Sequence, residues 1–262
     1  MASSLHVAFV SPLSFIETIV IRGIKTMLFR QLFDSETSTY TYLLADKRTQ
    51  EAVLVDPVFS QVNRDLWILS ELGLRLVYCL ETHIHADHIT GAGRLRQLTG
   101  CSTIVPAHAD IDCANRAIHA GELVKLGDVE IEAIATPGHT DHHLAYLVNG
   151  DHLLTGDALL IGGCGRTDFQ GGDPGQLYYS VTHILFSLPD TTLVYPGHDY
   201  HGNTVSSIRK EKLSNPRFVG RTKQGFIEFM NQLNLPDPKK MMEAVPANQT
   251  CGKAATENPV AA

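Results

Sequence analysis

The chain has 262 residues, of which 44% are hydrophobic and 19% are charged, and its formal net charge is −7. These proportions are typical of a folded globular protein and not of a disordered one. We expect no nucleic-acid or membrane partner, because nucleic acids and anionic membranes attract basic proteins. A chain of this length can bury a sizeable core in one large domain or two modest ones.

The first 26 residues contain an apolar run, Leu13 to Ile21, which Glu17 and Thr18 interrupt. The run is too short and too polar to span a bilayer, and the segment lacks the basic start and cleavage site of a secretory signal. We expect residues 1–26 to be an N-terminal extension, either flexible or of a mitochondrial targeting type. Folded structure is expected to begin near Met27.

Short β-like runs separated by turns dominate the chain from Met27 onward. The elements expected in the first half are strands at Leu28–Phe33, Thr39–Ala45 and Ala52–Asp56, a helix at Val62–Gly73, a strand at Leu74–Leu80 and a helix at Thr90–Gly100. The first helix is indicated by apolar residues that recur with the period of an α-helix and by a glycine at its end.

A second batch of strands and helices follows. The expected elements are strands at Thr103–Pro106, Leu123–Leu126, Val129–Thr136, His143–Val148 and His152–Thr155, a helix at Gln176–Ser187, a strand at Thr192–Tyr195, and helices near Ser206–Leu213 and Lys223–Leu233. Two batches of strands with helices after each predict an α+β fold, with two central sheets and helices outside. No linker divides the chain, so we expect a single domain at 27–252 and a disordered tail at 253–262.

Histidines are concentrated in one region, since twelve of the thirteen lie between His83 and His201. The segment His83-x-His85-x-Asp87-His88 directly follows the predicted strand that ends at Leu80. Side chains in such a loop gather at the carboxyl end of the strand, where ligands commonly bind. Imidazoles and carboxylates without thiolates suit Zn, Fe or Mn.

Three further ligand-type side chains also follow predicted strands: His139 in ATPGHT, Asp157 in LLTGDALL and His198 in LVYPGHDYHG. In each case a glycine stands next to the ligand-type residue, where a tight turn requires one. Four strand ends of this construction predict one shared metal site.

HxHxDH followed by His139, Asp157 and His198 resembles the metallo-β-lactamase superfamily over about residues 28–235. The resemblance implies an αββα sandwich with the metal site at one edge between the two sheets. It assigns His83, His85 and His139 to a first metal, Asp87, His88 and His198 to a second, and Asp157 to a bridge. All seven residues are present, so the ligands alone leave open whether one metal or two are bound.

Four other stretches resemble the glutathione persulfide dioxygenases, a branch close to glyoxalase II: LLIGGCGRTDFQ at 159–170, YPGHDYHG at 195–202, QLNLPDPKKM at 232–241 and AVPANQTCG at 244–252. This resemblance implies one Fe(II) per chain, held by His83, His139 and Asp157. Two histidines and one carboxylate are the facial triad of non-haem iron oxygenases. The residues His85, Asp87, His88 and His198 would then lie around the iron and hydrogen-bond its ligands or water.

The implied reaction converts glutathione persulfide, O₂ and water to sulfite and glutathione. Because glutathione is anionic, we expect Arg166 to bind the substrate, although an ion pair with Asp168 is the alternative. Tyr200 is expected to contact the peptide part, with a packed tyrosine as the alternative. Position 162 is glycine where relatives commonly carry arginine, and His142 and His143 are expected to fill part of the substrate channel or to tune the iron.

Two other functions stay open: a binuclear hydrolase of hydroxyacylglutathione thioesters, as in glyoxalase II, and a metal-binding or polysulfide carrier without oxidative activity. The resemblance further implies a homodimer and, since no rhodanese-type domain is present, a separate sulfurtransferase partner. The five scattered cysteines form no CxxC pair and indicate a reducing compartment. We therefore expect a bacterial cytoplasmic protein, with the mitochondrial matrix as the alternative.

Overall fold

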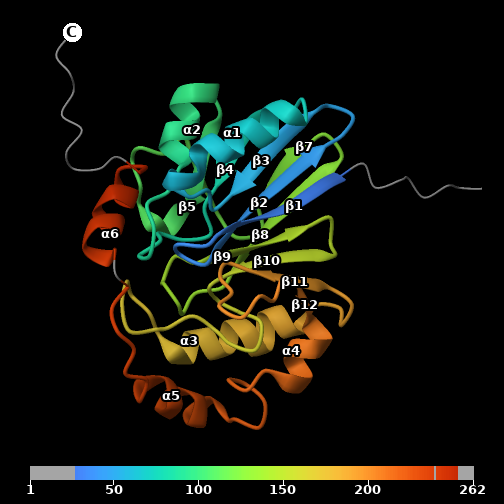
Figure 1. Ribbon diagram of the computed structural model, residues 1–262. Helices are drawn as coiled ribbons and strands as arrows, with labels where there is room; N and C mark the ends of the chain where they lie inside the picture. Colours follow the sequence, from blue (N-terminus) through green and yellow to red (C-terminus); the bar gives the residue numbers. More distant parts are fainter. Residues whose placement is uncertain (1–26, 239, 253–262) are drawn as a thin grey trace, which may run out of the picture.

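Two six-stranded sheets packed face to face form the centre of the molecule (Figure 1). The computed structural model describes residues 27–238 and 240–252. The expected N-terminal extension at 1–26 and the expected tail at 253–262 lie outside the described residues. The order of the strands is β1-β2-β3-β4-β5-β6 in the first sheet and β12-β11-β10-β9-β8-β7 in the second.

The first sheet is antiparallel at its N-terminal edge and parallel from β3 to β6. Its strands are β1 Met27–Asp34, β2 Thr39–Asp46, β3 Glu51–Val55, β4 Arg75–Leu80, β5 Ser102–Pro106 and β6 Arg116–Ile118. The second sheet is antiparallel except between β10 and β11. Its strands are β7 Leu123–Leu126, β8 Val129–Ala135, β9 Leu144–Val148, β10 His152–Gly156, β11 Leu193–Pro196 and β12 Ser206–Ser207.

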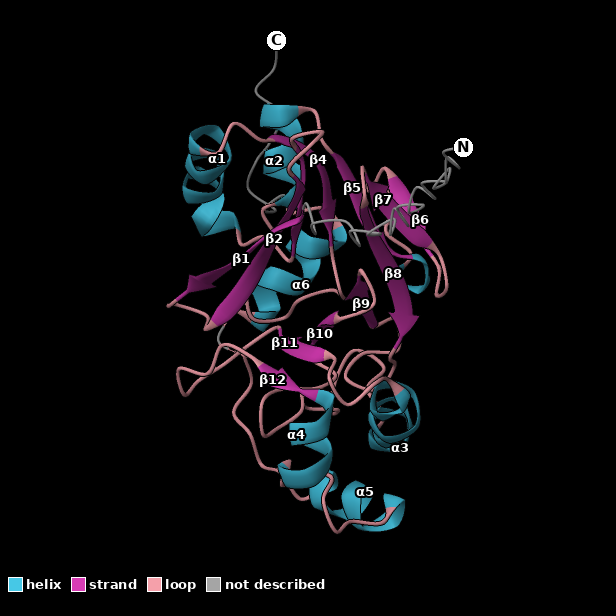
Figure 2. Cartoon of the chain, turned by 90° about the vertical axis from the view of Figure 1, so that its right-hand side faces the viewer, coloured by secondary structure: helices cyan, strands magenta, loops and turns pink. Residues whose placement is uncertain are grey.

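Helices cover the outer face of each sheet. Figure 1 shows α1 (Val62–Glu71) and α2 (Ala92–Thr99) over the first sheet, and α3 (Pro174–Tyr179), α4 (Ile208–Ser214) and α5 (Lys223–Asn231) beside the second. The remaining helix, α6 (Met241–Gln249), lies at one end of the sandwich, apart from both groups (Figures 1 and 2). The four layers are those of the expected αββα sandwich.

Three apolar layers hold this architecture together. Tyr42 and Leu44 of β2 point between the two sheets and pack with residues of the second sheet such as Ile131. Leu43 and Ala45 of the same strand point the other way, into the layer beneath α1 and α2. Successive side chains of a strand alternate between the two faces, and every residue of β2 is buried because both faces of its sheet are covered. A third layer lies between the second sheet and helices α3 to α5.

The sequence missed three elements, β6, β12 and α6. The first two have three and two residues at the outer edges of the sheets, which is too short for an alternating pattern to be recognised. The third contains Pro246 in its interior, and proline normally interrupts a helix. The helix expected at Gln176–Ser187 is also more complex, because α3 continues as a π-helix at Ser180–Ile184 and a 3₁₀ turn at Leu185–Ser187.

The interpretation of all five cysteines as reduced thiols is wrong for two of them. Cys113 and Cys251 form a disulfide bond that links the loop before β6 to the end of α6. The other three are free and buried: Cys79, Cys101 and Cys164. A separation of 138 positions hides such a pair in the sequence, because proximity is created only by the fold.

No helix in the described part of the chain is long and apolar enough to cross a membrane.

Candidate metal centre

Four strand ends bring ligand-type side chains to one edge of the sandwich. The loop after β4, in the first sheet, carries His83, while the turns after β8, β10 and β11, in the second sheet, carry His139, Asp157 and His198. The site therefore lies where the two sheets meet. Neither sheet supplies all of it.

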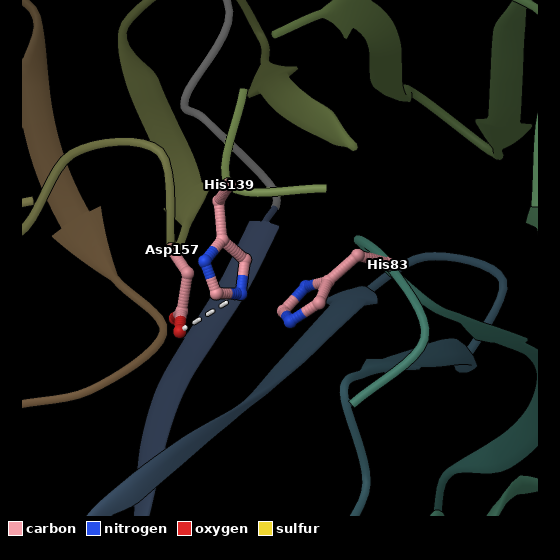
Figure 3. Close-up of side chains that lie close together, drawn as sticks. All are labelled: His83, His139 and Asp157. Atoms are coloured by element: carbon pink, nitrogen blue, oxygen red, sulfur yellow. Dashed lines mark ion pairs between the residues drawn. The ribbon is translucent and has the colours of Figure 1, made fainter. Parts of the chain in front are cut away.

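His83, His139 and Asp157 form the first group of donors, with one ligand atom from each within 4.8 Å of the others. Figure 3 shows the two imidazoles and the carboxylate pointing toward a common space. His139 Nε2 lies 3.6 Å from Asp157 Oδ2. All three residues are largely shielded from solvent.

Hydrogen bonds on the far side of each imidazole leave its Nε2 available to the common space. His83 Nδ1 lies 2.9 Å from Thr82 Oγ1, and His139 Nδ1 donates to the backbone carbonyl of Arg166 at 2.7 Å. Burial and the neighbouring histidines, His85 first among them, hold the pKa of His83 well below its usual value. A neutral imidazole keeps the lone pair that a metal ion requires.

A second group of donors adjoins the first. His85, Asp87 and His88 bring their ligand atoms within 4.8 Å of one another, and His198 Nε2 lies 3.6 Å from both Asp87 Oδ2 and Asp157 Oδ1. Burial alone would lower the pKa of His198, but the charges of Asp157 and Asp87 raise it. The fold thus brings together all seven metal-site residues that the sequence indicated.

Three buried atoms at this site that could bind a metal ion have no hydrogen-bond partner within the described structure: His85 Nδ1, His88 Nε2 and Asp157 Oδ1. Burying a polar atom without a partner is unfavourable. A divalent cation satisfies imidazole nitrogen and carboxylate oxygen together, and Zn, Fe and Mn all accept this donor set. The residues present therefore fit a metal ion, and they can hold one or two.

Two buried carboxylates that the sequence analysis did not single out orient His85. Its Nε2 lies 3.2 Å from Asp56 Oδ1 and 3.2 Å from Glu81 Oε2. Burial by itself would lower the pKa of His85, but the two carboxylates raise it well above its usual value. Asp56 also accepts hydrogen bonds from the backbone and hydroxyl of Thr82, at 2.7 and 2.8 Å. In the sequence, Asp56 indicated only the end of a strand and a turn, and nothing there predicted its contact with His85.

The guanidinium of Arg166 is engaged mainly by protein groups. It donates to both carboxylate oxygens of Asp168, at 2.6 and 2.5 Å, and to the carbonyl of Pro236 at 2.7 Å. It also lies 3.9 Å from the centre of the Phe169 ring. The ion pair with Asp168, which was the alternative interpretation of Arg166, is therefore present, and the backbone carbonyl of Arg166 orients His139.

Tyr200 and Asp199, which follow His198 in the chain, border an open depression of about 450 Å³. The Tyr200 ring is parallel to the His198 ring at 6.1 Å, and the residue is 67% exposed. A volume of this size is typical of a small-molecule pocket. None of the described residues that line the depression is basic, and Asp199 adds an acidic group.

His142 and His143 bind backbone groups around the metal site. Both are buried, and each accepts a backbone N–H at 3.0 Å: His142 from Ile84 and His143 from Asp157. Because Nε2 of His143 accepts the Asp157 N–H, Nδ1 carries the proton of the neutral ring and donates to Thr136 Oγ1 at 2.8 Å. His143 thus holds the backbone of the metal-site residue Asp157, and His142 holds that of Ile84, between His83 and His85.

The fold and the site define the class of protein. The family model of the metallo-beta-lactamase superfamily matches residues 35–198, which include all seven ligand-type residues. The chain therefore belongs to the metallo-β-lactamase superfamily.

Relatives that align with most of this chain include persulfide dioxygenases. The mitochondrial persulfide dioxygenase ETHE1 of Bos taurus is 47% identical over 229 residues, which cover 86% of this chain and 89% of that protein. The crystal structure of ETHE1 from Myxococcus xanthus is 53% identical, with a TM-score of 0.84 over 86% of this chain and all of that one. A hydroxyacylglutathione hydrolase of Dictyostelium discoideum is more distant, at 31% identity over 62% of each chain.

Proposed function

We propose that this protein is an iron-dependent persulfide dioxygenase that oxidises glutathione persulfide with O₂ to sulfite and glutathione. The observation that carries the proposal is the convergence of His83, His139 and Asp157 as one group of donors. It is supported by the near full-length similarity to persulfide dioxygenases.

The metal we propose is a single Fe(II) per chain, held by His83 Nε2, His139 Nε2 and a carboxylate oxygen of Asp157. Iron held by these two histidines and one carboxylate would supply the redox chemistry for oxidation by O₂ and would leave coordination positions open. In this proposal His85, Asp87, His88 and His198 orient the ligands and hold water rather than a second metal.

The reaction balances with one O₂ and one water per glutathione persulfide. The outer sulfur of the persulfide loses four electrons to O₂ and becomes sulfite, two oxygen atoms come from O₂ and one from water, and the bond to the glutathione sulfur breaks. Glutathione leaves as the thiol and two protons are released. His198 Nε2 lies 3.6 Å from Asp87 Oδ2 and from Asp157 Oδ1, so its imidazole is placed to take up one of these protons.

We propose that the depression beside Tyr200 receives the peptide part of glutathione, with the exposed phenol ring as its contact surface. Because basic residues are absent from the described lining, the substrate carboxylates depend on Arg166 or on backbone N–H groups. The positive charge of Arg166 is already offset by Asp168. Recognition by Arg166 would therefore use only the N–H groups that Asp168 and Pro236 leave free.

The test is a metal count together with two activity assays. The purified protein should contain about one iron per chain, consume O₂ in the presence of glutathione persulfide and release sulfite. Hydrolysis of S-lactoylglutathione is the comparison reaction. Two metals per chain with thioester cleavage and no O₂ uptake would overturn the proposal in favour of a binuclear hydrolase. The ligands for a second metal, His85, Asp87, His88 and His198, are also present.

We further propose a homodimer, which light scattering would report as twice the 28.7 kDa mass of the chain. A separate sulfurtransferase would supply or consume the persulfide. The mammalian ETHE1 relatives are named as mitochondrial, which supports the alternative compartment of the sequence analysis over the bacterial cytoplasm. We favour the mitochondrial matrix, and fractionation of the cells that produce the chain tests this assignment.

A further inference from the structure

One buried side chain from the far end of the sequence holds the loop that carries the histidine cluster. Asn248, in the last turn of α6, is 4% exposed. Its Nδ2 donates to the backbone carbonyls of His85 at 2.9 Å and of His88 at 2.8 Å. Its Oδ1 accepts the backbone N–H of Thr90 at 2.8 Å. Three backbone groups of one loop therefore depend on a single amide.

The chemistry of these three groups fixes the side chain at this position. Two carbonyls need two donors, and one N–H needs one acceptor, which together match the hydrogen-bonding capacity of a primary amide. The loop from Glu81 to Thr90 contains no helix and no strand of the two sheets, and the carbonyls of His85 and His88 and the N–H of Thr90 take their partner from the Asn248 side chain. A buried backbone group without a partner is unfavourable. The amide of Asn248 therefore stabilises the part of the loop from His85 to Thr90.

The contacts continue from Asn248 to the metal site. Thr90, whose N–H binds Asn248, donates its hydroxyl to Glu81 Oε1 at 2.5 Å. The other carboxylate oxygen of Glu81 lies 3.2 Å from His85 Nε2. The amide thus contacts the loop on both sides of Asp87 and is connected through two side chains to a histidine of the cluster.

The chain around Asn248 is itself closely packed against this loop. A Cβ atom on Gly93, in the first turn of α2, would lie 2.1 Å from the carbonyl oxygen of Cys251. A Cβ on Gly252 would lie 2.2 Å from the carbonyl oxygen of Thr90. The disulfide between Cys113 and Cys251 fastens the same segment. The residues that follow Asn248, Cys251 and Gly252, therefore hold this end of α6 against the loop.

We propose that Asn248 is a positioning residue for the metal centre, whose amide fixes the loop from His83 to His88 in the geometry that binds the metal ion. The proposal rests on the metal site described above, but not on the identity of the substrate. Asn248 acts through the backbone of the loop. The hydrogen bonds of its amide reach the backbone groups of His85, His88 and Thr90 and no side chain of the seven metal-site residues.

Metal affinity is the direct measurement. Co²⁺ serves as the probe, and its dissociation constant is obtained by competition with a chelator, with the visible absorption of the bound ion as the signal. The variant Asn248→Ala is expected to raise this constant about 10- to 100-fold, the usual effect of removing a group that supports metal ligands. Asn248→Asp keeps the size and the acceptor but presents oxygen to two carbonyls, so it should weaken binding at least as much.

Asn215 provides a matched control. It is fully buried, and its Nδ2 donates to the carbonyl of Gly163 at 3.0 Å and to Glu211 Oε2 at 2.8 Å. Asn215→Ala therefore removes a comparable buried amide outside the histidine loop. It should lower the melting temperature of the metal-free protein while leaving the Co²⁺ dissociation constant within about twofold of the wild type.

The outcomes separate positioning from a general structural effect. An unchanged Co²⁺ affinity in a folded Asn248→Ala protein, or equal losses for Asn248→Ala and Asn215→Ala, would overturn the proposal. If Asn248→Ala does not fold, the Co²⁺ dissociation constant of Asn248→Asp is compared with that of Asn215→Ala instead. A wild type that binds Co²⁺ but oxidises no persulfide would overturn the proposed function and leave this inference standing, whereas failure to bind Co²⁺ would overturn both.

Discussion

At the scale of single residues, His139 and His198 occupy similar positions after strands but are expected to differ in their effect on the metal. His139 Nε2 belongs to the group with His83 and Asp157, whereas His198 Nε2 lies between Asp87 and Asp157. With one iron per chain, His139→Ala should abolish iron binding, and His198→Ala should leave much of the iron in place. Metal analysis of both purified variants checks this. Equal loss of metal in the two variants would favour two metals.

The residues that contact the common space could be read from the sequence, but the residues that hold them could not. His83, His139 and Asp157 stand out because a histidine or carboxylate follows a strand with glycine nearby. The partners of His85, by contrast, are Asp56 and Glu81, and neither has a distinctive spacing. Asn248 contacts a loop that lies more than 150 positions earlier. Contacts of this kind depend on how separate elements pack, and no local pattern records them.

At the scale of secondary-structure elements, α1 contains an acidic group that should make stability depend on pH. Burial raises the pKa of Asp65 to about 6, although Arg64 lies beside it, and its Oδ2 has no hydrogen-bond partner within the described residues. The folded state therefore holds the Asp65 proton more tightly than the unfolded state, whose pKa is near 3.8. Stability from this group is greatest below about pH 4 and falls as the pH rises through 6.

The expected loss between pH 5 and pH 7 is about 1 kcal/mol. Asp65→Asn removes the titration, so the difference in free energy of unfolding between variant and wild type should shift by that amount in favour of the variant. Urea unfolding at the two pH values measures it. Glu71→Gln, at an exposed position of the same helix, serves as the control and should show no such shift. Identical pH dependence in wild type and Asp65→Asn would refute the assignment.

The disulfide that anchors α6 should contribute strongly to stability, because it closes a long loop. Cys113 and Cys251 are 138 positions apart, and cross-links of long loops typically stabilise a fold by about 2–4 kcal/mol. Cys113→Ser should lower the free energy of unfolding by that amount in denaturant titrations. A reductant should have the same effect on the wild type and none on the variant. If the reductant leaves the wild type unchanged, the bond does not contribute as described.

Prediction at this scale succeeded where elements are long and regular. Strands such as β2 and β8 and helices such as α1 show the periods expected of them, and the αββα order follows from two batches of strands. Failures lie where regularity is lost. The π-helix at Ser180–Ile184 differs from an α-helix in its hydrogen bonds and not in its residue types, and α6 retains a helical course despite Pro246.

At the scale of the whole molecule, the metal ion should stabilise the contact between the two sheets. His83 follows a strand of the first sheet, and His139 and Asp157 follow strands of the second, so an ion bound to all three favours the assembled state. At a free metal concentration 100 times the dissociation constant, the gain is about 2.7 kcal/mol. Calorimetry with and without a chelator should show a clear drop in melting temperature when the metal is removed. His139→Ala should be insensitive to the chelator.

The division of the ligands between the sheets also has a kinetic meaning. Residues between positions 83 and 198 must be brought together before a metal site exists, and contacts between such distant positions form slowly during folding. The ion therefore cannot act as an early organiser of the chain. In refolding experiments with excess metal, the rate of ion uptake should equal the rate at which the sheets dock and should not increase with metal concentration. A newly made chain would thus acquire its metal in the last step of its maturation.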